Sequence, residues 1–149
     1  MSYFIDNCHE IVPNLFLGNY LVANDLEYLK VLGITHIINC SIEHPNYFSD
    51  NFNYLYLPLR DDTSENIFIY FNKSFEFIRD CHKKNGKVLV HCHAGVSRSS
   101  TIVIAYLMKK YKKPFYKTLK YIQSIRGVVN PNEGFRLQLE CYEECKNDE

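Results

Sequence analysis

The sequence predicts an α/β fold with a central, mainly parallel sheet of about five strands and helices on both faces of that sheet. Short β-branched segments alternate with longer segments of helical spacing, and this order is typical of units whose strands run parallel. The chain has 149 residues, of which 46% are hydrophobic. That is enough for one core and leaves little room for a second. We therefore expect one domain over residues 1–149.

Turn residues and capping residues divide the first third of the chain. Apolar residues over 10–17 predict an edge strand, since the run contains a proline. Asn24, followed by Glu27, predicts a capping box for a helix over 25–32. The β-branched run over 34–39 predicts a buried strand.

The spacing of hydrophobic residues predicts the helices and strands in the rest of the chain. Ligands in such folds bind beyond the carboxyl ends of the strands, so the polar residues that follow each strand should share one rim. The remaining elements are expected as a strand over 54–59, a carboxylate-rich loop over 60–66, a helix over 67–84, a strand over 87–91, and helices over 101–108, 114–125 and 132–146.

The stretch 88–100 predicts an oxyanion site. An apolar strand there runs into a short loop and a helix N-terminus, where backbone N–H groups and the helix dipole attract anions. Cys92 enters the loop where those groups and Arg98 would stabilise a thiolate. Gly95 permits the positive φ that such a loop needs. Arg98 offers two donors to an oxyanion, and Ser99 can donate a hydrogen bond to the thiolate.

Two motifs carry a resemblance to a known family. Residues 91–99 read HCHAGVSRS, which resembles the HCxxGxxRS signature of the cysteine-dependent protein tyrosine phosphatases, in a form similar to the dual-specificity subgroup. Residues 130–139 read NPNEGFRLQL and are similar to the NPNxGFxxQL segment of the same family. The resemblance covers nearly the whole chain, and the first ten residues match least. It implies a protein tyrosine phosphatase-like fold and a phosphocysteine intermediate.

The resemblance also implies roles for individual residues. Cys92 is the nucleophile, Arg98 binds the phosphate, and Ser99 stabilises the thiolate as it leaves. His91 orients the loop through backbone hydrogen bonds, or is simply a buried histidine, and Asn130 supports the rim of the site. The backbone N–H groups that complete the phosphate site belong to His93, Ala94, Gly95, Val96 and Ser97.

Phosphate-ester cleavage also needs a general acid. Asp61 and Asp62 are both candidates, and the residues alone do not separate two adjacent carboxylates. In the family that the chain resembles, the acid lies five residues before an Asn that precedes the next helix. Counting back from Asn66 gives Asp61, which leaves Asp62 as a solvated loop residue.

Charge and loop composition narrow the substrate class. Seventeen basic residues balance seventeen acidic ones, so no global field recruits nucleic acid or an acidic membrane. The loop lacks the lysine of the phosphoinositide phosphatases, and we expect neither a carbohydrate-binding nor a rhodanese-like kinase-docking module. The chain resembles a small atypical dual-specificity phosphatase whose shallow pocket admits phosphotyrosine, phosphoserine and phosphothreonine in proteins. A weakly active phosphate-binding interaction module and a sulfurtransferase are the alternatives, and the oligomeric state stays open.

The six cysteines include no CxxC pair, and no signal peptide or membrane-anchoring apolar run accompanies them. We therefore expect reduced thiols in the cytoplasm or the nucleus. Cys40 could capture oxidised Cys92 as a disulfide if their strands are neighbours, or it could be a buried apolar cysteine. Side chains of the adjacent residues His91, Cys92 and His93 cannot converge on one ion, so no metal or other cofactor is expected.

Overall fold

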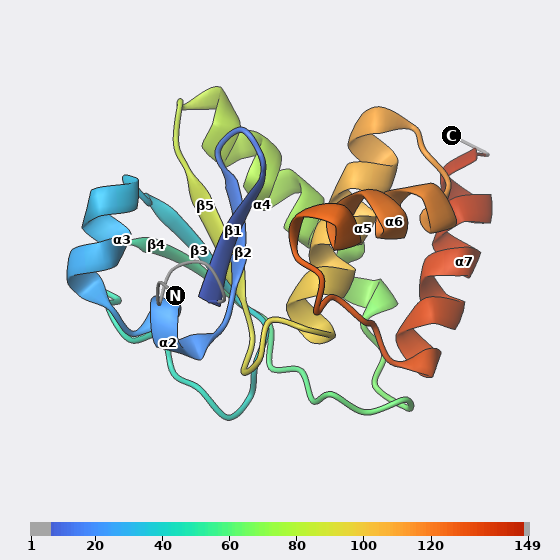
Figure 1. The fold of residues 1–149 in the computed structure, drawn as a ribbon, viewed down its shortest axis with the longest axis horizontal. Coiled ribbons are helices and arrows are strands. Elements are labelled where there is room, and N and C mark those ends of the chain that lie inside the picture. Colours follow the sequence, from blue (N-terminus) through green and yellow to red (C-terminus); the bar gives the residue numbers. More distant parts are fainter. Residues whose placement is uncertain (1–6, 148–149) are drawn as a thin grey trace.

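The computed structural model describes residues 7–147, and its centre is a five-stranded sheet in the order β1-β2-β5-β3-β4 (Figure 1). β1 pairs antiparallel with β2, and the other three pairings are parallel. This confirms the predicted mainly parallel sheet. The strands are β1 (Cys8–Val12), β2 (Leu15–Gly18), β3 (His36–Asn39), β4 (Asn53–Tyr56) and β5 (Val88–His91).

Helices cover both faces of the sheet, as Figure 1 shows. Two short helices pack on one face, and four longer helices pack on the other, where α5 lies against β5. The helices are α2 (Tyr20–Ala23), α3 (Leu26–Leu32), α4 (Phe71–Lys83), α5 (Arg98–Tyr111), α6 (Phe115–Ile125) and α7 (Glu133–Asn147), with a 3₁₀ turn, η1 (Phe68–Tyr70), before α4. No helix within residues 7–147 is long and apolar enough to span a membrane.

The expected single edge strand over 10–17 is wrong, because the chain reverses in the middle of it. Pro13 has no backbone N–H for a strand ladder, and Asn14 adopts a left-handed φ of 69°. The Glu10 carboxylate accepts a hydrogen bond from the Asn14 amide at 2.8 Å and closes the turn. The run therefore forms the hairpin β1–β2, and of these two strands β1 lies at an edge of the sheet.

The cap expected at Asn24 lies one residue further on. Asp25 is the N-cap of α3, and its carboxylate accepts a hydrogen bond from the Tyr28 amide at 3.1 Å. Asn24 instead ends α2, a short helix that the sequence did not predict. At the other end of the chain, Asn132 caps α7 as expected, accepting a hydrogen bond from the Phe135 amide at 2.9 Å.

The parallel strands end level with one another, and this sets the position of the site. In the sheet register, Gly18 of β2 and Asn39 of β3 both stand beside His91 of β5. The residues that follow, Cys40 and Cys92, therefore leave neighbouring strands at the same rim. Helix α5, expected over 101–108, begins earlier, at Arg98. Its dipole and first free N–H groups therefore face this rim.

Candidate active site

Cys92 lies where β5 turns toward α5, in a loop of residues 92–97 that we call the Cys92 loop. Its side chain is only 2% exposed. The Sγ atom lies 3.1 Å from the Oγ atom of Ser99, which stands in the first turn of α5. A hydroxyl at that distance can donate a hydrogen bond to a thiolate, so the expected pairing of Cys92 with Ser99 is present in the geometry.

Gly95 makes the sharp bend of the Cys92 loop. Its φ is 69°, in the left-handed region that other residues enter at a cost. Space is limited as well, because a Cβ atom here would lie 2.6 Å from the Arg126 guanidinium and 2.7 Å from the Gly18 carbonyl oxygen. Backbone conformation and packing therefore both require glycine.

Arg126 holds the Cys92 loop from behind, a role that no motif in the sequence indicated. The side chain is 1% exposed. Its Nε donates to the Gly95 carbonyl at 3.0 Å and its Nη2 donates to the Ala94 carbonyl at 3.1 Å. In a planar trans peptide the next N–H points opposite to the carbonyl. The amides of Gly95 and Val96 consequently point away from Arg126, as an anion-binding loop requires.

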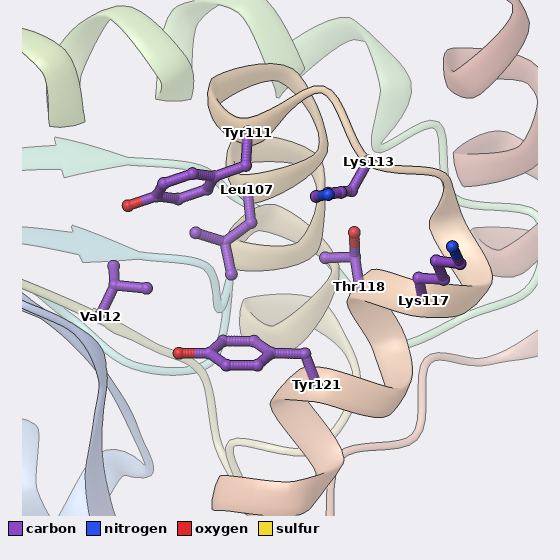
Figure 2. A pocket seen from close by; sticks show the side chains of 7 residues that line it. All are labelled: Val12, Leu107, Tyr111, Lys113, Lys117, Thr118 and Tyr121. Carbon is purple, nitrogen blue, oxygen red and sulfur yellow. The ribbon is translucent and has the colours of Figure 1, made fainter.

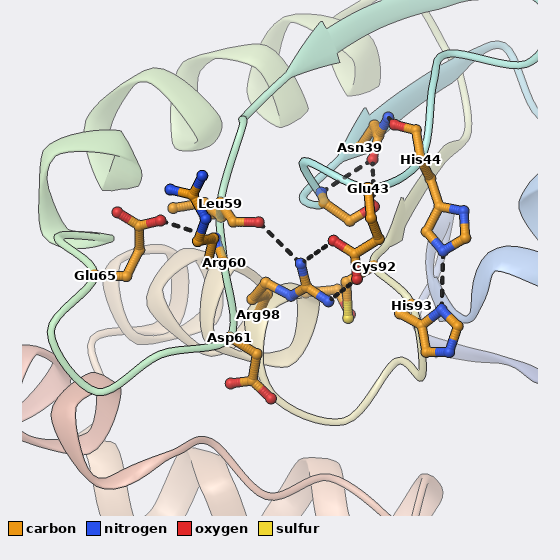
Figure 3. A network of polar contacts seen from close by, with 12 residues as sticks. Asn39, Glu43, His44, Leu59, Arg60, Asp61, Glu65, Cys92, His93 and Arg98 are labelled. Atoms are coloured by element: carbon orange, nitrogen blue, oxygen red, sulfur yellow. Dashed lines mark hydrogen bonds and ion pairs between the residues drawn. The ribbon is translucent and has the colours of Figure 1, made fainter.

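Arg98 is held in place by Glu43, another residue that the sequence reading passed over. The Nη1 and Nη2 atoms donate to the two Glu43 carboxylate oxygens at 2.6 and 2.7 Å, and Nη1 also donates to the Leu59 carbonyl at 2.8 Å (Figure 3). The hydrogen bond from Arg98 lowers the pKa of Glu43 to about 2. The buried Nε of Arg98 keeps a donor without a partner in the described structure.

The two candidate acids have different surroundings, although both side chains are exposed. One carboxylate oxygen of Asp61 accepts a hydrogen bond from the Asn132 Nδ2 at 2.9 Å, and the Asp61 charge acts on Arg98. Asp62 instead accepts from the amide and the hydroxyl of Ser64, at 2.9 and 3.0 Å. The bond from the Ser64 amide, then the one from its hydroxyl, lower the pKa of Asp62. Asp62 therefore closes a turn, whereas Asp61 binds Asn132 and lies close enough to Arg98 for their charges to interact.

A segment more than sixty residues away holds the loop of residues 60–66, which we call the Asp61 loop. Asn132 binds Asp61 itself. Gly134 packs so closely on the carbonyl of Thr63 that a Cβ atom would overlap it. The amide of Gln138 donates to the Glu65 carbonyl at 2.9 Å. The NPNxGFxxQL resemblance marked these positions, but the sequence indicated no contact with the acid.

The same segment also contacts the Cys92 loop. The backbone amide of Asn130 donates to the Val96 carbonyl at 2.8 Å, and the amide of Asn132 donates to the Ser97 hydroxyl at 3.0 Å. Asn130 thus lies at the rim where it was expected, and its contact is made by the backbone. One segment therefore fixes the Cys92 loop and the Asp61 loop relative to each other.

His91 and Cys40 lie beneath the Cys92 loop. His91 is buried, and its Nδ1 donates to the Cys92 carbonyl at 3.3 Å. Burial lowers the pKa of His91 to about 4, so the ring is neutral at neutral pH. Cys40 is fully buried, and its amide donates to the His91 carbonyl at 2.8 Å. Burial, and secondarily the nearby Cys92, raise the pKa of the Cys40 thiol.

A cavity of about 430 Å³ lies elsewhere, at the far end of α5 (Figure 2). Leu107 and Tyr111 of α5 form one wall, and Thr118 and Tyr121 of α6 form another. Tyr121 also donates a hydrogen bond to the Ile11 carbonyl at 2.7 Å. None of the residues around Cys92 lines this space, so it is separate from the candidate active site.

Comparisons with known proteins agree with this geometry. Residues 15–145 match the family described as "Dual specificity phosphatase, catalytic domain". Protein-tyrosine-phosphatase MKP1 of Arabidopsis thaliana is 39% identical over 140 residues, which cover 93% of this chain and 18% of that protein. The chain spans less than half the length of the curated relatives it matches.

Two solved structures extend the likeness to the whole fold. The human tyrosine phosphatase-like serine/threonine/tyrosine-interacting protein shares 42% identity, with a TM-score of 0.88 over 94% of this chain and 97% of that one. DUSP15 shares 34% identity, with a TM-score of 0.88 over 96% of this chain and 94% of that one. The chain therefore belongs to the dual-specificity phosphatases of the protein tyrosine phosphatase superfamily, a family of phosphoric monoester hydrolases, and is similar to its small atypical members.

Proposed function

We propose that residues 1–149 form one catalytic domain that hydrolyses phosphotyrosine, phosphoserine and phosphothreonine in proteins. The observation that carries the proposal is the position of Cys92. Its Sγ atom lies in the loop at the N-terminus of α5, with the Ser99 hydroxyl at 3.1 Å and with Arg98 opening the helix. This position supports a role for Cys92 as a sulfur nucleophile beside an oxyanion site.

The first step is attack of the Cys92 thiolate on phosphorus, which forms a P–S bond as the P–O bond to the leaving group breaks. Asp61, protonated at this stage, gives its proton to the leaving oxygen. In the second step Asp61, now a carboxylate, takes a proton from water as that water attacks the phosphocysteine. Inorganic phosphate leaves, and the Cys92 thiolate is restored with a hydrogen bond from Ser99.

Arg98 and the loop amides stabilise the charge that develops on the equatorial oxygens of the phosphoryl group. The ion pair with Glu43 fixes the plane of the guanidinium, so Glu43 is a positioning residue. Backbone amides from His93 to Ser97 complete the set of donors. Protein groups and water supply every proton and electron pair in this scheme.

The substrate class follows from the exposed surroundings of the loop. His93 and Ala94 on one side and the Asp61 loop on the other are open to solvent, which supports a shallow site that accepts phosphoprotein. No cysteine forms a disulfide, and all six are among the described residues. This supports a reducing compartment, the cytoplasm or the nucleus.

Hydrolysis of p-nitrophenyl phosphate tests the mechanism. The purified protein should release p-nitrophenol, and vanadate, which resembles the phosphoryl transition state, should inhibit that release. Cys92→Ser should reduce turnover to background while leaving the fold intact, as checked by circular dichroism. Turnover that survives Cys92→Ser would rule out the thiolate mechanism.

A second function, phosphate-dependent binding without useful turnover, is favoured by one relative. The human protein with 42% identity is described as tyrosine phosphatase-like and interacting. This chain keeps Cys92, Arg98 and Asp61, with Cys92 beside Ser99 and Arg98 paired with Glu43, and we therefore rank hydrolysis first. A binding module would retain phosphopeptides in a pull-down and release no phosphate from them.

Cys40 supplies a further part of the proposal, protection of the nucleophile from oxidation. It leaves β3 at the register position beside β5, so a sulfenic acid on Cys92 could condense with its thiol to give a disulfide and water. After mild peroxide treatment, mass spectrometry of the digested protein should find the Cys40–Cys92 crosslink, and Cys40→Ser should lose activity irreversibly. Full recovery of Cys40→Ser activity on addition of a thiol would contradict this role.

A further inference from the structure

Two imidazoles lie edge to edge beside the Cys92 loop. The Nε2 atom of His44 is 2.9 Å from the Nδ1 atom of His93, and the two ring planes differ by only 9°. Both rings stack on Tyr20, each with its centroid 4.7 Å from that of the tyrosine. Figure 3 shows the two nitrogens facing each other. The roles proposed above for the Cys92 loop do not use the pairing of His93 with His44.

A contact at its second nitrogen fixes the direction of the His44 ring, and a backbone contact anchors His93. The other nitrogen of His44, Nδ1, lies 2.7 Å from the Tyr47 hydroxyl. The carbonyl of His93 accepts a hydrogen bond from the Tyr20 amide at 3.0 Å. An imidazole whose second nitrogen is bonded to a neighbouring group is typical of metal-binding histidines, because that bond sets the tautomer and the ring orientation.

A carboxylate completes the set of donors. The ligand atoms of Glu43, His44 and His93 all lie within 4.8 Å of one another. Glu43 and His93 are exposed and His44 is half-buried, so an ion can reach all three from solvent. Glu43 also binds Arg98, and the cluster therefore adjoins the phosphate-binding guanidinium.

We propose that His44, His93 and Glu43 form a binding site for Zn²⁺. Two imidazole nitrogens and one carboxylate oxygen suit this ion, and a three-residue set leaves a fourth tetrahedral position for water. Zn–N distances of about 2.0–2.1 Å put tetrahedral ligand atoms about 3.3 Å apart. The two nitrogens are now 2.9 Å apart and face each other, so binding requires the rings to separate and turn until both lone pairs point at the ion. It also requires the Glu43 carboxylate to turn away from Arg98 and toward the ion.

Zn²⁺ binding displaces the hydrogen that lies between the two rings, and the other nitrogen of the same ring can accept it. In the neutral pair one of the two facing nitrogens carries a hydrogen, and Zn²⁺ requires a lone pair on both. If that hydrogen is on His44 Nε2, it moves through solvent to Nδ1, and the bond with Tyr47 reverses so that Nδ1 donates. No net proton is released. Glu43 also pairs with Arg98, and His93 belongs to the Cys92 loop, so the test measures binding of the ion and not activity.

The experiment is a Zn²⁺ titration by calorimetry in a chain that lacks the competing thiols. Cys92, Cys141 and Cys145 are replaced by serine, because the last two are exposed and Cys92 is nucleophilic. This protein should bind one Zn²⁺ per chain. His44→Gln should weaken binding at least tenfold, and Tyr47→Phe should weaken it by up to about tenfold through the loss of its support.

A matched control is His36→Gln. His36 is half-buried like His44, but it lies at the opposite end of β3, so this variant should bind Zn²⁺ unchanged. Thermal unfolding with and without the ion checks that each variant folds, and Zn²⁺ should raise the melting temperature less in His44→Gln than in its parent. The site is refuted if the chain with these three serines binds no Zn²⁺, or if His44→Gln and Tyr47→Phe bind as tightly as their parent.

Discussion

The Cys92 loop and the Asp61 loop reach the same site by different means. The first is contiguous with a buried strand and a buried helix, and a buried arginine holds its carbonyls. The second is exposed, and its position depends on side chains of the segment 130–138. The nucleophile is therefore fixed by local backbone geometry, and the proton donor by contacts across the chain. Substitutions in the two loops should therefore affect stability and kcat in different ways.

The largest expected effect separates the two aspartates of the Asp61 loop. Asp61→Asn should lower kcat on a phosphotyrosyl peptide by about 10²- to 10⁴-fold, since general acid catalysis is worth that much. Asp62→Asn keeps an acceptor for the Ser64 donors and should change kcat by only a few fold. Steady-state kinetics on the peptide measure both. A larger loss of kcat in Asp62→Asn than in Asp61→Asn would mean that Asp62, and not Asp61, is the general acid.

The conformation of the Cys92 loop should be disrupted by replacing Gly95 with alanine. Gly95→Ala puts a Cβ atom against Arg126 and Gly18 at a positive φ, which should cost about 2–4 kcal/mol of stability. The strained loop would turn its backbone amides away from the phosphoryl oxygens, which should lower kcat by about 10²- to 10³-fold. The matched control is Gly127→Ala, where the nearest atom to a Cβ is 4.0 Å away. Urea unfolding and kinetics should show little change in that control.

Burial around the Cys92 loop also makes stability depend on pH. The folded pKa of His91 is lowered to about 4 from 6.5, so stability is complete above pH 6.5 and falls as the pH drops toward 4, because only the unfolded chain takes up the proton. One pKa unit is worth about 1.4 kcal/mol, which gives a loss of about 3 kcal/mol. The free energy of unfolding, measured with urea at several pH values in this range, should depend less on pH in His91→Gln than in the original protein. An equal pH dependence in the two proteins would contradict the assignment.

The same contrast explains what the sequence could and could not predict. Cys92, Gly95 and Arg98 stand at fixed spacing within one strand–loop–helix unit, so local reasoning found them. Arg126 and Glu43 were missed because their partners lie at least thirty residues away and nothing in their own surroundings marks them. The hairpin at Pro13 was missed for a different reason: its apolar flanks read as one continuous strand.

The smallest expected effect tests whether the Asp61 loop depends on its distant support. Asn132→Asp keeps a good cap for α7 but replaces the amide that binds Asp61 with a second negative charge. The two carboxylates repel each other, which should displace the Asp61 loop. We expect about a tenfold loss of kcat on phosphotyrosyl peptides. The loss should be smaller on p-nitrophenyl phosphate, whose leaving group needs less help from an acid. Equal losses on both substrates would mean that Asn132 supports the Cys92 loop, through Ser97, rather than the proton donor.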